Sequence, residues 1–314
     1  MNSSRPTLVY HLALSFTALI YGVNYFTMKW IFDIGHLHPL GVLCIRSFFS
    51  SLFFVVFYLL FLREKIKSWA DFGRMLLCAL TGMVINQAMF IWGVSQTTLV
   101  NAAVLQTMSP VFVFIATIFI GQEIITKKKV TGLSLSLAGA ALLVIANAEG
   151  NFSFSSKTLT GDLMIMVNAA VYGIYLVIAK PLFLKYNLFT LQAWQFGLAA
   201  LVNIPLGAGY VQEIQFADLP IKAWFGLAFF IVFATIVAYI LYAWALKHMN
   251  PSSVSVYIYF QPVFVSVISV LLNEGTVTFE KIIYILIIFS GVYLVTSRTN
   301  SALPPKGTIP VIAP

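Results

Sequence analysis

Two matching stripes of polar and aromatic side chains lie inside stretches that are otherwise apolar. The first stripe consists of Thr17, Tyr21, Asn24 and Met28, at intervals of four, three and four residues. The second, 151 positions later, consists of Asn168, Tyr172, Tyr175 and Ala179. These intervals put each stripe on one face of a helix, where it can bind a small polar solute or hydrogen-bond a neighbouring helix. The sequence leaves both interpretations open.

A single arginine, Arg46, lies about seven residues into an apolar run, roughly 10 Å from its start at 1.5 Å per residue. A charge at that depth is costly and usually faces the protein interior. The guanidinium could bind a substrate carboxylate or phosphate, extend outward to water, or pair with Asp33. Further polar candidates for the same binding site are Asn86, Gln106, Tyr239, Tyr242, Tyr257 and Gln261.

Residues suited to catalysis or metal binding are sparse. The histidines, which lie at or near loops without ligand spacing, are His11, His36, His38 and His248. No acidic residue lies in the middle of an apolar run, and Glu123 and Glu274 are interpreted as solvated caps or loop pairs. No glycine-rich phosphate loop is present, so ATP is not expected as the direct energy source. The sequence therefore predicts a protein that is not an enzyme and has no metal or other cofactor.

The composition points to a membrane. Of the 314 residues, 60% are hydrophobic and 9% are charged, and the mean hydropathy is +0.94. A soluble domain carries about 25% charged residues, so the lipid bilayer is the expected surrounding. The net charge of +8 comes from residues in short loops, which membrane topology explains better than a nucleic-acid partner. The two cysteines, Cys44 and Cys78, lie in apolar runs and provide no disulfide framework.

Ten apolar runs are long enough to span the bilayer, which takes about 20 residues. They lie near 8–32, 39–62, 72–93, 98–120, 129–147, 161–183, 189–211, 222–246, 251–272 and 279–297. The first run is too long for a signal-peptide core. The longest break, Ala148 to Thr160, separates the first five runs from the last five. The proline-rich end, 298–314, is predicted to be disordered.

The last five runs repeat the first five. Trp92, the sequence Pro110-Val111-Phe112-Val113 and Gly139 recur 152 positions later as Trp244, Pro262-Val263-Phe264-Val265 and Gly291. Because five is an odd number, the second set is inserted upside down. The sequence predicts an all-α integral membrane protein with ten transmembrane helices as two inverted five-helix repeats. This is the usual build of a secondary transporter, whose site lies between the repeats.

The cavity is expected to be lined by the first, third, fourth, sixth, eighth and ninth helices. Pro110 and Pro262 lie near the middle of the fourth and ninth, where each kinks its helix. Their equivalent positions favour a pair of hinges over static packing kinks. The fifth helix is rich in small residues, which predicts close packing; they are Gly132, Ser134, Ser136, Gly139 and Ala140.

Loop charges set the expected orientation. With the N-terminus in the cytoplasm, thirteen lysines and arginines lie on the cytoplasmic side and three, Lys157, Lys222 and Lys281, lie outside. This bias follows the positive-inside rule and predicts that both termini are cytoplasmic. Lys29 and Lys180 lie near helix ends, where their side chains are expected to extend to the membrane surface.

Several short motifs together resemble the drug/metabolite transporter superfamily, of the bacterial EamA type. In the first half they are Tyr21-Gly22-Val23-Asn24, Lys29, Pro39, Arg46, Asn101-Ala102-Ala103, Ser109-Pro110, Gly121-Gln122-Glu123, Gly132 and Gly139. In the second half they are Pro251-Ser252-Ser253, Gln261-Pro262, Asn273-Glu274 and Gly291. The resemblance implies two EamA-type repeats, here 8–147 and 161–297, and transport of small metabolites, often outward. The second half departs from the pattern, since Gly197 or a neighbour stands where Arg46 would recur.

The expected function is a multi-pass permease of the inner membrane that exports a small organic metabolite, such as an amino acid. A nucleotide-sugar or phosphate-ester carrier is the alternative within transporters, although it would need paired cations at the cavity. A membrane enzyme acting on lipid-linked substrates would need clustered acids or histidines. A sensor or scaffold would need a loop long enough to fold alone. The sequence leaves a homodimer open.

Overall fold

The computed structural model describes residues 6–147, 157–272, 276 and 278–297. All regular elements in these ranges are helical. In the first half they are α1 (Pro6–Lys29), η1 (Trp30–Ile34), α2 (Pro39–Phe57), η2 (Tyr58–Leu62), α3 (Trp69–Cys78), η3 (Ala79–Ile85), α4 (Asn86–Gln96), α5 (Leu99–Gln106), α6 (Ser109–Phe119) and α7 (Lys127–Asn147). In the second half they are α8 (Leu159–Lys185), α9 (Leu188–Gln212), η4 (Phe216–Asp218), α10 (Ile221–Ile231), η5 (Val232–Val237), α11 (Ala238–His248), α12 (Pro251–Ser255), η6 (Val256–Phe260), α13 (Gln261–Leu271) and α14 (Phe279–Thr296). The predicted disordered tail, 298–314, lies outside the described residues.

Nine helical stretches of the described ranges are long and apolar enough to cross a membrane. Several join consecutive elements, as in Trp69–Gln96, which runs through α3, η3 and α4. The remaining long helix, α9, has 25 residues but is less apolar, because it carries Gln192, Gln195 and Asn203. The protein is therefore an all-helical, multi-pass membrane protein. Nine of its described helical stretches meet the length and hydropathy of a membrane span, against the ten that the sequence predicts.

Side-chain caps fix where several helices begin. The Ser68 side chain accepts a hydrogen bond from the Asp71 backbone N–H at 3.1 Å, and the Thr98 side chain accepts one from Asn101 at 3.0 Å. At the start of α9, the Asn187 side chain accepts from the Phe189 N–H at 2.9 Å. Each cap satisfies a backbone donor that a helix start leaves unpaired.

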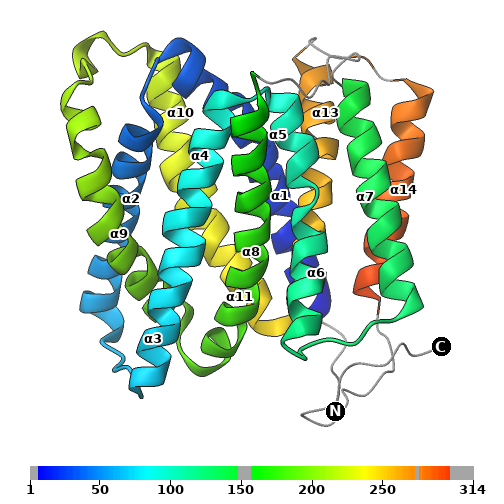
Figure 1. Ribbon diagram of the computed structural model, residues 1–314, viewed down its shortest axis with the longest axis horizontal. Helices are drawn as coiled ribbons and strands as arrows, with labels where there is room; N and C mark the ends of the chain where they lie inside the picture. Colours follow the sequence, from blue (N-terminus) through cyan, green and yellow to red (C-terminus); the bar gives the residue numbers. More distant parts are fainter. Residues whose placement is uncertain (1–5, 148–156, 273–275, 277, 298–314) are drawn as a thin grey trace.

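The helices stand side by side in one bundle, as Figure 1 shows. The pair α2 and α9 forms one edge and the pair α7 and α14 forms the other. Between them, α8 packs on α4 and α6, and α1 packs on α11 and α13. Large apolar side chains exposed on the outer surface include Leu60, Phe119, Leu201, Leu271 and Phe279, as a lipid-facing surface requires. In Figure 1, α1 begins at the lower end of the bundle and α8 begins at the upper end.

Small residues let two helix pairs approach closely. A Cβ atom added at Gly291 in α14 would lie 2.3 Å from Ser136 Oγ, and one at Gly132 would lie 2.7 Å from the Gly291 carbonyl oxygen. The predicted close packing of α7 is therefore confirmed. In the other pair, a Cβ at Gly207 in α9 would lie 2.2 Å from the Leu40 carbonyl oxygen in α2.

Replacing Gly207 with alanine should destabilise the bundle, because α9 would have to move away from α2. Overpacking of this kind typically costs about 1–3 kcal/mol. Gly209, two residues along the same helix, has nothing within 4 Å of an added Cβ, so Gly209→Ala is the matched control and gains helix propensity. Thermal melts of the two purified variants in detergent measure the difference. Equal melting temperatures would contradict the close approach of α2 and α9.

Candidate functional site

A cavity lies inside the bundle and is lined by helices from both halves of the chain. The volume open to the centre of a water molecule is about 110 Å³, which is room for several waters or a small organic molecule. The ten side chains expected from the sequence to bind substrate all line it: Tyr21, Asn24, Arg46, Asn86, Gln106, Tyr172, Tyr175, Tyr239, Tyr257 and Gln261. Tyr242 lines it too, whereas Met28 and Ala179, the last members of the two stripes, do not. Two further helices line the cavity that the sequence did not place there. The second predicted helix, α2, contributes Arg46, and the seventh, α9, contributes Gln192.

Arg46 is buried, with 2% of its surface exposed. Its Nε donates a hydrogen bond to the Thr235 hydroxyl at 2.8 Å. The guanidinium carbon lies 5.9, 5.3 and 5.6 Å from the ring centroids of Phe196, Phe230 and Tyr239, within range of a cation–π interaction. The side chain neither extends outward nor pairs with Asp33 in the described contacts. The expectations that Arg46 extends to water or pairs with Asp33 are therefore wrong.

A chain of amide and hydroxyl groups crosses the cavity. Asn86 and Asn168 exchange hydrogen bonds between α4 and α8, each side-chain nitrogen donating to the other residue's backbone carbonyl at 3.0 and 2.7 Å. Gln87 Nε2 donates to Asn86 Oδ1 at 2.7 Å and to the Tyr239 hydroxyl at 2.9 Å. Gln192 Nε2 donates to the Tyr239 backbone carbonyl at 3.1 Å. Asn168 of the second stripe thus joins α8 to α4 and lines the cavity at once, whereas Tyr21 and Asn24 of the first stripe line the cavity without a described hydrogen bond to another helix.

Two members of this chain, Gln87 and Gln192, are not among the residues selected from the sequence. Their only signal there is a glutamine inside an apolar run, since neither belongs to a repeated stripe. Gln192 is fully buried. Three cavity-lining amide oxygens have no hydrogen-bond partner among the described residues: Gln106 Oε1, Asn168 Oδ1 and Gln192 Oε1. These atoms are acceptors that a bound molecule could use.

The helices that carry Pro110 and Pro262 are broken where they meet the cavity. Helix α5 ends at Gln106, and after a turn α6 begins with Pro110 as its second residue. In the second half, the 3₁₀ segment η6 separates α12 from α13, and Pro262 is again the second residue. A proline is well tolerated in the first turn of a helix, where its missing N–H would be unpaired anyway. The expected kinks are therefore breaks between two helical segments.

A π-helical turn interrupts the third helix of each repeat, which the sequence does not reveal. These turns are η3 and η5, and the first residue of η5 is the counterpart of Leu80 at the offset of 152. In η5, the Thr235 hydroxyl donates to the Phe230 carbonyl oxygen at 2.8 Å and accepts from Arg46. Turns of this type often occur at functional sites. Here the wider turn holds the hydroxyl that positions Arg46.

Comparison with known proteins identifies the family. The model of the EamA-like transporter family matches residues 8–145 and 159–297. The chain belongs to the EamA-like transporter family. It is 30% identical to an uncharacterized transporter of Archaeoglobus fulgidus over 92% of this chain and 98% of that one. It is 24% identical to a probable terminal-alkyne amino-acid exporter of Streptantibioticus cattleyicolor over 61% of this chain and 62% of that one. A crystal structure that is 17% identical has the same fold, with a TM-score of 0.69 over 90% of this chain and 95% of that one.

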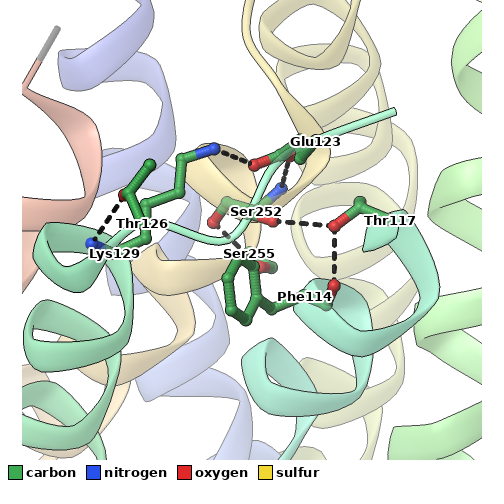
Figure 2. Close-up of polar contacts among 7 residues, drawn as sticks. All are labelled: Phe114, Thr117, Glu123, Thr126, Lys129, Ser252 and Ser255. Atoms are coloured by element: carbon green, nitrogen blue, oxygen red, sulfur yellow. Dashed lines mark hydrogen bonds and ion pairs between the residues drawn. The ribbon is translucent and has the colours of Figure 1, made fainter. Parts of the chain in front are cut away.

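In this EamA-like transporter, a buried acid contacts the start of each of the two broken helices, α5–α6 and α12–α13. Figure 2 shows Glu123, which pairs with Lys129 at 2.6 Å and accepts a hydrogen bond from the Ser252 N–H at the start of α12 at 3.2 Å. Glu123 is 3% exposed and pairs with Lys129, so the solvated cap is wrong and the ion pair is confirmed. Glu274, which has the same two interpretations in the sequence, lies outside the described residues. At the start of α5, Asp162 accepts from the Asn101 amide at 3.2 Å. Carboxylates are stabilised near helix N-termini.

Lys180, near the lower end of α8 in Figure 1, caps the end of α11. Its Nζ donates hydrogen bonds to the carbonyl oxygens of Leu246, Lys247 and Met249 at 2.6, 3.2 and 2.8 Å. These carbonyls end α11, where a helix leaves acceptors unpaired. The lysine is half-buried, so the expectation that it extends to the membrane surface is wrong. Close by, the Tyr172 hydroxyl donates to the Tyr242 hydroxyl, which links α8 to α11.

Lys29, the counterpart of Lys180 in the first half, makes no such contact among the described residues. Lys29 is exposed and has no hydrogen-bond or ion-pair partner in the part of the chain that the structure describes. It lines two pockets near the upper end, with volumes open to the centre of a water molecule of about 510 and 600 Å³. The second of these is also lined by Val94, Ser95 and Thr97, the counterparts of the three acceptors of Lys180.

Single cysteines at Tyr21 and Gln106 should react with a water-soluble thiol reagent, because both side chains line the cavity and thiolates form only in contact with water. The measurement uses a background with Cys44 and Cys78 replaced by alanine. Ile174→Cys is the control, since Ile174 is 44% exposed on the outer surface of α8. We expect labelling of the cavity cysteines to be about tenfold faster or more. Faster labelling at position 174 would mean that the cavity is dry.

Proposed function

We propose that this protein is a secondary transporter that exports small organic metabolites by alternating access, with amino acids and related compounds as the substrates. The observation that carries the proposal is the cavity between the two halves of the chain, with a buried cation and free amide acceptors on its wall. The similarity to a probable terminal-alkyne amino-acid exporter supports the substrate class. The proposed binding residues are the ten cavity-lining side chains selected from the sequence.

The proposed framework is ten membrane-spanning helices in two inverted repeats. We take α9 as the tenth span, since its 25 residues are enough to cross the hydrocarbon core. Helix breaks and π-helical turns recur at equivalent positions of the two halves, and α1 and α8 begin at opposite ends of the bundle in Figure 1. Repeats related in this way give two half-molecules that can rock about a central site.

The proposed orientation puts the lower end of Figure 1 in the cytoplasm and the protein in the inner membrane. The positive-inside bias of the loops supports it, with thirteen lysines and arginines against three. In this orientation both termini are cytoplasmic, and the Lys180 contacts at the lower end, which have no counterpart at Lys29 among the described residues, support an outward-facing state.

A phosphate-ester or nucleotide-sugar carrier is less well supported. Such a substrate carries about two negative charges, which paired cations usually neutralise. The described cavity wall contains one cation, Arg46, while Lys29 and Lys222 lie in the neighbouring pocket. The single cation favours substrates with one negative group.

Flux measurements test the transport function. Purified protein in liposomes should release preloaded radiolabelled amino acids of a mixed panel faster than protein-free liposomes, with saturation as loading increases. In the same assay, Pro110→Ala and Pro262→Ala should fold and transport more slowly, because we propose that the helix breaks act as hinges. Wild-type flux no faster than the leak from protein-free liposomes would contradict the transport proposal. Normal transport rates in both proline variants would contradict the hinge role.

The two lysines test alternating access. We expect Lys180→Met to open the lower end, and Lys29→Met to prevent closure of the upper end, because each lysine would cap the carbonyls of the facing helix in one state only. Cysteine at Tyr21 reports the change: impermeant reagent should label it less from outside in the first variant and more in the second, by severalfold.

Two controls accompany the lysine variants. Lys247→Met removes a cation at the same end of α11 whose side chain makes no described hydrogen bond, and should label like the parent. Lys180→Arg keeps the donors and should restore labelling. Equal labelling in all variants would refute the exchange of lysine contacts.

A further inference from the structure

We infer that Arg46 is the recognition site for a carboxylate group of the substrate, and that the unpartnered amide oxygens of the same cavity receive its N–H donors. This inference rests on the proposed function, because it names the chemistry by which the transported molecule is held. The substrate class that fits is a small monocarboxylate with an amine or amide nitrogen, of which α-amino acids are the simplest.

The first argument is the missing counter-charge. Arg46 is 2% exposed and permanently charged. The only described ion pairs, Lys129 with Glu123 and Lys185 with Asp71, lie elsewhere in the protein. The described cavity wall contains no aspartate or glutamate. A buried charge without a partner is costly, and an anionic ligand would supply the partner.

The second argument is how the guanidinium is presented. Its Nε is used by Thr235, and rings from α9, α10 and α11 surround it. The two terminal amino groups have no hydrogen bond among the described contacts, and the residue lines the cavity. A fork of two parallel N–H donors matches the two oxygens of a carboxylate. Packing and the Thr235 contact hold the fork in place before the ligand arrives, so little side-chain entropy is lost on binding.

The third argument separates a carboxylate from a phosphate and accounts for the nitrogen. One guanidinium balances one negative charge, and a phosphate monoester carries nearly two. The oxygens of Gln106, Asn168 and Gln192 have no donor in the described structure, although all three are buried atoms. Buried acceptors are normally satisfied, so a ligand with N–H groups completes the site.

Ligand protection of the purified protein in detergent tests the inference without relying on flux. The probes are L-leucine, L-phenylalanine and L-threonine, each with its carboxamide, together with 4-methylpentanoate and inorganic phosphate. At least one amino acid should raise the melting temperature at concentrations about tenfold or more below its carboxamide. The acid without an amine, 4-methylpentanoate, should protect more weakly than leucine.

Variants decide whether Arg46 is responsible. Arg46→Gln should lose the preference for acid over amide, and Arg46→Lys should keep the preference with weaker binding, because a lysine supplies the charge without the fork. Arg74→Gln, on an exposed arginine of α3, is the matched control and should bind like the parent. Melting temperatures without ligand and size-exclusion profiles show whether each variant is folded.

Four outcomes overturn the inference: equal protection by acids and amides, stronger protection by phosphate, no protection by any acid, or an unchanged acid preference in folded Arg46→Gln. Arg46-dependent binding without flux would leave the carboxylate site intact and remove the transport proposal. Equal flux of amino acids and their carboxamides would leave the transport proposal intact and contradict the carboxylate site.

Discussion

The hydrocarbon core of a bilayer offers no hydrogen-bonding partner to a peptide group, and this constraint organises the whole molecule. Regular helices satisfy it by themselves. The irregular backbone of η3, η5, η6 and the turn before α6 gathers around the cavity instead, where side chains can replace the lost helix bonds. Thr235 does so for the Phe230 carbonyl. The cavity thus accommodates these broken helices, while α1, α2, α8 and α9 contribute much of its polar wall.

Buried acids in the described part of the bundle have polar partners in the protein, and Arg46 differs from them. Glu123 pairs with Lys129, and Asp162 receives hydrogen bonds from the start of α5. Both join the start of a broken helix to a neighbouring segment. Arg46 has an aromatic cage but no counter-charge among the described residues. A charge with a structural role usually pairs with another residue of the protein, whereas Arg46 lines a cavity.

Duplication gives the two halves the same helices but different contacts. Lys180 caps the end of α11, while Lys29 is exposed beside the equivalent end of α4. Arg46 has no twin in the second half, where Gly197 or a neighbour stands at its place. Because of the first difference, a lysine caps helix carbonyls at one end of the described bundle only. The second gives the cavity a charged side, so that a polar ligand has a preferred direction in it.

The sequence alone determined the membrane class, the duplication, the positions of the proline breaks and ten side chains that line the cavity. These features are local: they depend on apolar run length, on residue type and on a helical period that keeps one face together. It did not determine the π-helical turns, the Glu123 contact with a residue 129 positions away, the roles of Gln87 and Gln192, or the capping by Lys180. It also left open whether Arg46 reached water, paired with Asp33 or faced a ligand. Those outcomes depend on which helices become neighbours, and only the tertiary structure brings Arg46 to Thr235, 189 positions along the chain.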